Sequence, residues 1–174
     1  MDISGKVAIV TGGASGIGRA VVVALATKGA SIAVADVDDI GGGEAVALAK
    51  LAGGDAKFYR IDITDPAELS LLFAQAQHDF GLIDIVCNNA GIVSGNPKWP
   101  DTSLAKLKAV IDVNFTGVVL GTRLAIEAMR GDGGVIINTA STAAFAPRNE
   151  DAAYTATQAA VVSFTQSCKE LATT

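Results

Sequence analysis

The sequence predicts an α/β fold in which helices cover both faces of a doubly wound parallel sheet. Five short apolar runs alternate with segments of helical periodicity, and this alternation is typical of strands joined by right-handed helical crossovers. Half of the residues are hydrophobic and 18% are charged, which implies an extensive core. The first apolar run also ends in a glycine-rich turn. We therefore expect one domain over residues 1–174, with five strands in the order 3-2-1-4-5.

The first predicted strand, residues 7–10, leads into the turn T-G-G-A-S-G-I-G and then into a helix. Glycines permit tight turns and close approach of a ligand to the backbone, and a helix that begins near Ser15 directs free N–H groups at the turn. This arrangement predicts a pyrophosphate site in a Rossmann-like, dinucleotide-binding fold, although a plain connecting loop is the alternative. The cofactor-binding residues expected here are Gly12, Ser15, Gly16, Ile17 and Gly18.

The second predicted strand, residues 31–35, stops at Asp36. An acidic residue about 20 residues after the glycines can accept hydrogen bonds from the adenosine ribose hydroxyls. It would also repel a 2′-phosphate, so Asp36 favours NAD over NADP. The alternative is that Asp36, Asp38 and Asp39 only form a polar turn before the next helix.

The other elements follow from apolar periodicity and from capping residues. Further strands are expected at 57–61, 83–87 and 135–138. Helices are expected at 44–51, at Pro66–Phe80, from Asp101 or Thr102 towards Asn114, at Phe115–Met129, and from about Asp151 to Ala172. Gly117 and Gly121 lie four residues apart, which indicates a close helix contact with the sheet or with a second subunit.

Composition argues against several classes of function. The net charge of -5 without a basic cluster argues against nucleic acid and against an anionic membrane surface as partners. The N-terminus lacks the pattern of a secretory signal, so we expect a cytoplasmic location. The single histidine, His78, lies among Gln and Asp residues on an expected solvent face, and no metal cluster is predicted. Cys87 and Cys168 are expected to be buried thiols.

Polar or glycine residues follow the predicted strands at Gly12, Asp36, Asp62, Asn88 and Ser141. Ligands of open parallel sheets bind at the carboxyl ends of the strands, near the point where the strand order reverses. Segments far apart in the sequence are therefore expected to meet in one cleft.

With these motifs in order, the whole chain resembles the classical short-chain dehydrogenase/reductase family. The family's T-G-x-x-x-G-x-G matches residues 11–18, and its N-N-A-G matches residues 88–91. The resemblance implies that Asp62 and Ile63 flank the adenine, and that Asn88, Ala90 and Gly91 brace the nicotinamide side. It also implies four catalytic-site residues, namely Asn114, Ser141, Tyr154 and Gln158.

Two departures from the family pattern stand out. The family motif is Y-x-x-x-K, whereas Tyr154 is followed four residues later by Gln158. A nearby ammonium group makes a tyrosine hydroxyl more acidic, and glutamine can bond to ribose hydroxyls but brings no charge. The second departure is that family members continue beyond Thr174 through further strands and a substrate-covering segment. We therefore expect strand 135–138 to be an unpaired edge that favours self-association.

The function that follows is hydride transfer between NAD(H) and an alcohol or ketone. The expected partner is a small apolar substrate, because the resemblance places an apolar wall beside the reacting atoms. The residues of that wall are Ile92, Val93, Ala143, Phe145 and Pro147. The alternatives are an NAD-binding pseudoenzyme and a truncated, weakly active product.

Overall fold

A computed structural model describes residues 2–169. Its five strands form one parallel sheet in the order β3-β2-β1-β4-β5, as predicted. The strands are β1 (Val7–Thr11), β2 (Ser31–Asp36), β3 (Asp55–Arg60), β4 (Ile85–Asn88) and β5 (Val135–Asn138). Neighbouring strands are in close register, so that Ile9 of β1 lies between Ala33 of β2 and Val86 of β4. The carboxyl ends of β1, β2 and β4 therefore meet at the same edge of the sheet.

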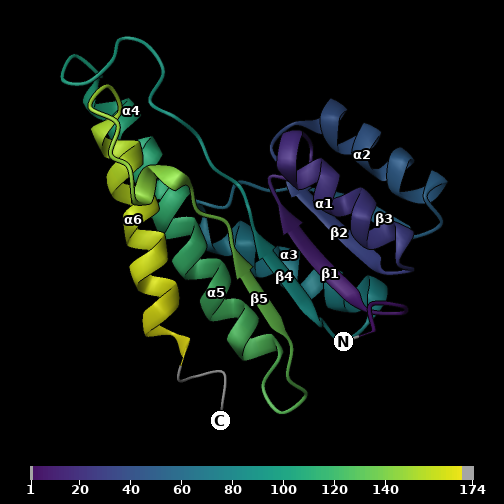
Figure 1. The fold of residues 1–174 in the computed structure, drawn as a ribbon. Coiled ribbons are helices and arrows are strands. Elements are labelled where there is room, and N and C mark those ends of the chain that lie inside the picture. The colour runs from purple at the N-terminus through teal and green to yellow at the C-terminus, as the bar shows by residue number, and fades with distance from the viewer. Residues whose placement is uncertain (1, 170–174) are drawn as a thin grey trace.

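Helices cover both faces of this sheet (Figure 1). The helices are α1 (Gly16–Thr27), α2 (Asp39–Leu51), α3 (Pro66–Phe80), α4 (Leu104–Ile111), α5 (Gly117–Ala128) and α6 (Ala152–Ser167). A π-helix, η1 (Asp112–Thr116), joins α4 to α5, and a 3-10 turn, η2 (Thr142–Ala144), follows β5. Val22 of α1 and Ala45 of α2 belong to the core on one face, and Leu72 of α3 and Ala125 of α5 to the core on the other. The alternating side chains of the strands fill both cores.

Helix α2 begins at Asp39, earlier than the predicted range 44–51. The side chain of Asp38 caps this helix by accepting hydrogen bonds from the backbone N–H groups of Ile40 and Gly41. A Cβ atom at Gly42 would collide with the ring of Phe58. Gly42, which would weaken a helix in isolation, is thus needed for α2 to lie close to β3, and at this position packing outweighs propensity.

Other boundaries also move by a few residues. Helix α4 begins at Leu104 and is capped by Ser103, rather than by Asp101 or Thr102. The predicted long helix at 115–129 starts instead as a π-helix containing Asn114, before α5 continues from Gly117. The last helix ends at Ser167, and residues 170–172 of its predicted range lie outside the described residues.

The two glycines of the predicted close contact face the sheet side of the molecule. A Cβ atom at Gly117 would lie 2.5 Å from the Ile63 side chain, and one at Gly121 would collide with the Asn88 side chain. The combined segment Leu104–Ala128 is long and apolar enough, by length and composition alone, to cross a membrane. Here it carries the buried residues of α5 that pack against β4, as a core helix does.

Candidate functional site

The glycine-rich turn is held against the segment that follows β4. Gly12 and Gly16 have φ angles of 64° and 50°, a left-handed conformation that glycine adopts without strain. A Cβ atom on Gly12 would lie 2.7 Å from the Cα atom of Ala90, so the two backbones can approach only because residue 12 is glycine. The Thr11 hydroxyl accepts hydrogen bonds from the N–H groups of Asn89 and Ala90 at 3.0 and 3.2 Å. The turn and the segment after β4 therefore form one wall.

The N-terminus of α1 has no side-chain cap among the described residues. Ser15 occupies the cap position, but its side chain accepts no hydrogen bond, and the first turn contains no acidic residue. In contrast, side chains cap α2, α3, α4 and α6, which are those of Asp38, Asp65, Ser103 and Asp151. A Cβ atom on Gly16 would meet no heavy atom within 4 Å. Free N–H donors beside open space, with the positive end of the helix dipole, suit the diphosphate of a dinucleotide.

A cleft of about 520 Å³ runs along the carboxyl ends of the strands. Every predicted site residue except Asn88 lines it. These residues are Gly12, Ser15, Gly16, Ile17, Gly18, Asp36, Asp62, Ile63, Ala90, Gly91, Asn114, Ser141, Tyr154 and Gln158. The glycine turn and the tyrosine helix, which are distant in sequence, thus share one cavity of a size suited to a small organic ligand.

Asp36 lies at the end of β2 with its carboxylate fixed by backbone donors. One oxygen accepts from the N–H of Ala14 at 3.0 Å, and the other accepts from the N–H groups of Val37 and Asp38 at 2.8 and 3.2 Å. The nearby Arg19 guanidinium donates to the Ala14 carbonyl and pairs with Glu44 at 3.0 Å. The charge of Asp36 therefore has no cation paired with it among the described residues.

Asn114 joins three parts of the site. Its side-chain oxygen accepts from the N–H of Ile92, and its nitrogen donates to the Ile92 carbonyl, each at 2.8 Å. The same nitrogen donates to the Thr157 hydroxyl at 3.3 Å, and that hydroxyl donates to the Tyr154 carbonyl at 2.7 Å. Since its π-helix places Asn114 between these partners, the residue braces both the segment after β4 and α6.

Three polar side chains leave groups available to a ligand. The Ser141 oxygen accepts from the Ala143 N–H at 3.1 Å, which leaves its own hydrogen free to be donated. Tyr154 lies in the first turn of α6, and its hydroxyl has no hydrogen-bond partner among the described residues. Gln158 is only 6% exposed, and its amide bonds to no group within residues 2–169. A side-chain amide that faces a cleft without a protein partner suits a polar ligand group.

Asn88 lies beneath the cleft rather than in its wall. Its side-chain nitrogen donates to the Thr122 hydroxyl at 3.2 Å and to the Asn138 side-chain oxygen at 2.8 Å. Asn138 in turn donates to the Thr165 hydroxyl at 3.0 Å. This network, which is buried at Asn88 and Thr122, ties β4, β5, α5 and α6 together. Asn88 therefore positions the elements of the site without touching its open space.

The predicted apolar wall is only partly present. Ile92 and Val93 line the cleft, whereas Ala143 is a buried residue of η2 and does not line it. Phe145 is 79% exposed, and Pro147 is also exposed, and neither lines the cleft. Two other contacts were not predicted, because their partners are distant in the chain. One is the hydrogen bond from the Asn89 side chain to the Thr11 carbonyl, and the other is the Ser94–Asp151 pair.

Other reactive side chains lie away from this chemistry. Burial raises the pKa of the Cys87 thiol to about 11, so it stays protonated at neutral pH. Cys168 is free and half-buried, rather than buried as predicted. His78 is largely exposed beside Asp79, 3.0 Å away. Within residues 2–169, no group of three or more His, Cys, Asp or Glu side chains is arranged to hold a metal ion.

Comparison with known proteins identifies relatives of this chain. A family model described as short chain dehydrogenase matches residues 6–174. The chain is 41% identical over 167 residues to a 2,5-dichloro-2,5-cyclohexadiene-1,4-diol dehydrogenase of Sphingobium indicum. It is 36% identical over 165 residues to a 3-beta-hydroxysteroid dehydrogenase of Comamonas testosteroni. A crystal structure of a short chain dehydrogenase/reductase from Burkholderia phymatum in complex with NAD matches with a TM-score of 0.91 at 32% identity.

These matches cover most of this chain but only part of the length of each relative. They span 95%, 94% and 96% of the chain, and 66%, 63% and 60% of the three proteins, respectively. The family model matches nearly the whole chain, and the solved structure has the same overall fold. The chain therefore belongs to the short-chain dehydrogenase family.

Proposed function

We propose that this chain forms a dinucleotide-binding domain that transfers a hydride between NAD(H) and an alcohol or ketone. The observation that carries the proposal is that Ser141, Tyr154 and Gln158 line the same cleft as the glycine turn. Two relatives are named as dehydrogenases of a cyclohexadiene diol and of a hydroxysteroid. Both names describe ring alcohols of largely apolar molecules, which supports a small apolar alcohol or ketone as substrate.

The cofactor's diphosphate would bind to the uncapped first turn of α1, where Gly16 leaves open space. Asp62 and Ile63 would flank the adenine, and Ala90 and Gly91 would support the nicotinamide side. The Gln158 amide would bond to the ribose hydroxyls, since it is buried in the cleft wall. The nicotinamide ring supplies or accepts the hydride when it is bound.

The proposal includes a preference for NAD over NADP. The Asp36 carboxylate stands at the end of β2, where the adenosine ribose would lie, and a 2′-phosphate there would meet its charge. Arg19 offsets little of this repulsion because it is already paired with Glu44. Titration of the chain with both cofactors checks this: we expect tighter binding of NAD(H), and Asp36→Ala should narrow the difference. Equal affinities in the unaltered chain would contradict it.

Tyr154 would exchange a proton with the substrate oxygen, donating it when a ketone is reduced and accepting it when an alcohol is oxidised. Ser141 would donate its free hydrogen to the same oxygen and hold the substrate in place. Asn114 keeps Ile92 and α6 at a fixed separation, and so sets the width of the cleft between them. A role for Asn114 in ordering a proton-relay water is part of the proposal.

The test is NAD-linked oxidation of cyclic secondary alcohols, followed by NADH absorbance, together with NAD binding by calorimetry. We expect slow turnover that Tyr154→Phe reduces by about 10²- to 10⁴-fold while NAD still binds. Binding of NAD without turnover of any alcohol or ketone would favour a pseudoenzyme. If the chain neither binds NAD nor turns over a substrate, and shows no cooperative melt, the result would favour a truncated, weakly folded product. A cytoplasmic location also remains part of this proposal.

A further inference from the structure

Asp151 lies at the start of the tyrosine helix and holds two segments that are far apart in sequence. One carboxylate oxygen accepts from the Tyr154 N–H at 3.3 Å and caps α6. That oxygen also accepts from the Ser94 hydroxyl at 2.5 Å, and the second oxygen accepts from the Ser94 N–H at 3.0 Å. Ser94 is 4% exposed and Asp151 is half-buried, so these charge-assisted bonds are partly shielded from water.

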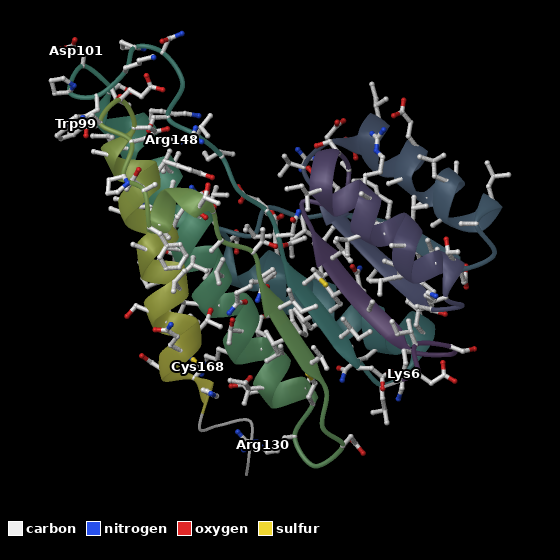
Figure 2. All side chains as sticks on the ribbon, viewed as in Figure 1. Lys6, Trp99, Asp101, Arg130, Arg148 and Cys168 are labelled. Carbon is white, nitrogen blue, oxygen red and sulfur yellow. The ribbon has the colours of Figure 1, made fainter. Side chains whose placement is uncertain are left out.

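The surrounding contacts make this pair part of a longer junction between the loop after β4 and the loop before α6. The Trp99 N–H donates to the Glu150 carbonyl at 3.2 Å, and Lys98 pairs with Glu150. Trp99 and Arg148, which come from these two loops, lie at the same end of the molecule (Figure 2). Asn114 fixes Ile92 on the other side of the same segment. The cleft wall at Ile92 and Val93 and the helix that carries Tyr154 are thus fastened to each other.

We propose that Asp151 is a positioning residue, which acts through Ser94 to hold Tyr154 at a fixed distance from the substrate wall. The carboxylate is well suited to this, because its two oxygens serve the loop and the helix at once. A small displacement of an acid/base group costs much of its rate, even when every reacting group is present. The inference rests on the proposed function for its rate measurement, but the junction itself has an independent readout.

The variants separate the junction from the helix cap. Ser94→Ala removes one bond of the junction and leaves the cap of α6 intact. Asp151→Asn keeps an effective cap, but its amide nitrogen cannot accept from the Ser94 N–H. Asp151→Ala removes both functions. The matched control is Asp65→Ala, since Asp65 caps α3 in the same way and does not line the cleft.

Two measurements are made on the full chain. Steady-state oxidation with NAD should show kcat falling about tenfold or more in Ser94→Ala and Asp151→Ala, and less in Asp151→Asn. NAD affinity should stay close to that of the unaltered chain. The double variant Ser94→Ala with Asp151→Ala should be no slower than Asp151→Ala alone, because the two residues act as one unit. Asp65→Ala should lower the melting temperature with little change in kcat.

Trp99 is the chain's only tryptophan and is 47% exposed, so its quenching by iodide reports on the junction without turnover. Quenching should increase in Ser94→Ala and Asp151→Ala but not in Asp65→Ala. Unchanged quenching would overturn the junction, and a kcat loss in Asp65→Ala equal to that in Asp151→Ala would overturn positioning. If the unaltered chain oxidises no alcohol, the proposed function fails, whereas Trp99 quenching still decides whether Asp151 holds the loop.

Discussion

An uncharged amide occupies position 158, on the same face of α6 as Tyr154 and one turn away. A lysine there would bring a positive charge beside the tyrosine hydroxyl and would favour its deprotonated form. Its cost is the burial of an ammonium group at a position that is 6% exposed. The charge of a lysine should therefore raise the reaction rate, whereas its burial should lower the stability of the fold.

We expect Gln158→Lys to raise the rate of alcohol oxidation at neutral pH, by as much as about 10²-fold, and to lower the melting temperature. Initial rates by NADH absorbance and thermal melts measure the two effects separately. Tyr154→Phe in the Gln158→Lys background should remove the gain. If Gln158→Lys leaves the rate unchanged while Tyr154→Phe abolishes it, the missing charge is not what limits the chain.

Helix α5 approaches the sheet closely because Gly121 has no side chain. A Cβ atom there would collide with the Asn88 side chain, which belongs to the network joining β4, β5 and α6. Gly121→Ala should therefore destabilise the fold by about 1–3 kcal/mol, as overpacking does. Denaturant unfolding measures this.

Gly43→Ala is the matched control for that substitution. Gly43 lies inside α2, and a Cβ atom there would meet nothing within 4 Å. The change should stabilise the chain by about 0.5–1 kcal/mol, because glycine weakens a helix interior. Destabilisation of similar size in both variants would mean that close packing of α5 is not the cause.

At the scale of elements, the sequence predicted the strand order and the bounds of α3 and β5, because period and capping are local signals. It placed the start of α2 too late, since the three glycines at 41–43 look like a helix breaker until Phe58 is known to lie against Gly42. It missed the bonds between Asp151 and Ser94 because the partners are 57 residues apart. Nothing local marks a residue whose hydrogen-bond acceptor comes from another segment.

The molecule as a whole is expected to lose stability in acid through a cluster that joins β3 to α3. Hydrogen bonds from Lys57 and Tyr59, each 2.6 Å long, hold the pKa of the Asp79 carboxyl well below its usual range. A carboxyl with a lowered folded-state pKa stabilises the fold above its unfolded value, near pH 4, and loses this contribution as the pH falls further. Burial and Asp79 also raise the pKa of the Tyr59 hydroxyl, which stays protonated throughout this range.

Asp79→Asn should flatten the dependence of stability on pH below about pH 4, while lowering stability at neutral pH. Denaturant midpoints across an acid pH series measure this. Asp101→Asn is the control, because Asp101 is exposed and its side chain has no hydrogen-bond partner among the described residues. If the denaturant midpoints of the unaltered chain and Asp79→Asn fall in parallel as the pH is lowered, Asp79 is not the cause of the loss of stability in acid.

The two edges of the sheet differ in charge. The edge strand β3 carries Asp55, Lys57 and Arg60, and charged residues discourage pairing with other chains. Among the described residues β5 pairs only with β4, and its Val135 and Ile137 are 39% and 49% exposed. We propose that the purified chain self-associates through the β5 edge.

Size-exclusion chromatography with light scattering, over a wide range of protein concentration, measures this association. Ile137→Lys should shift the chain towards the monomer. Leu51→Lys is the control, because Leu51 is 85% exposed on α2 and far from that edge in the sheet order. A monomer at every concentration in the unaltered chain would exclude association through β5.

The uncapped first turn of α1 also affects how the chain responds to ordinary buffers. The backbone N–H groups proposed to bind a diphosphate should bind other multivalent anions as well, because the positive end of a helix attracts any such anion. Sulfate and inorganic phosphate should therefore compete with the cofactor and stabilise the cofactor-free chain. The affinity for NAD measured in phosphate buffer would then be weaker than in a buffer without such anions, because phosphate has to leave the turn before the cofactor binds.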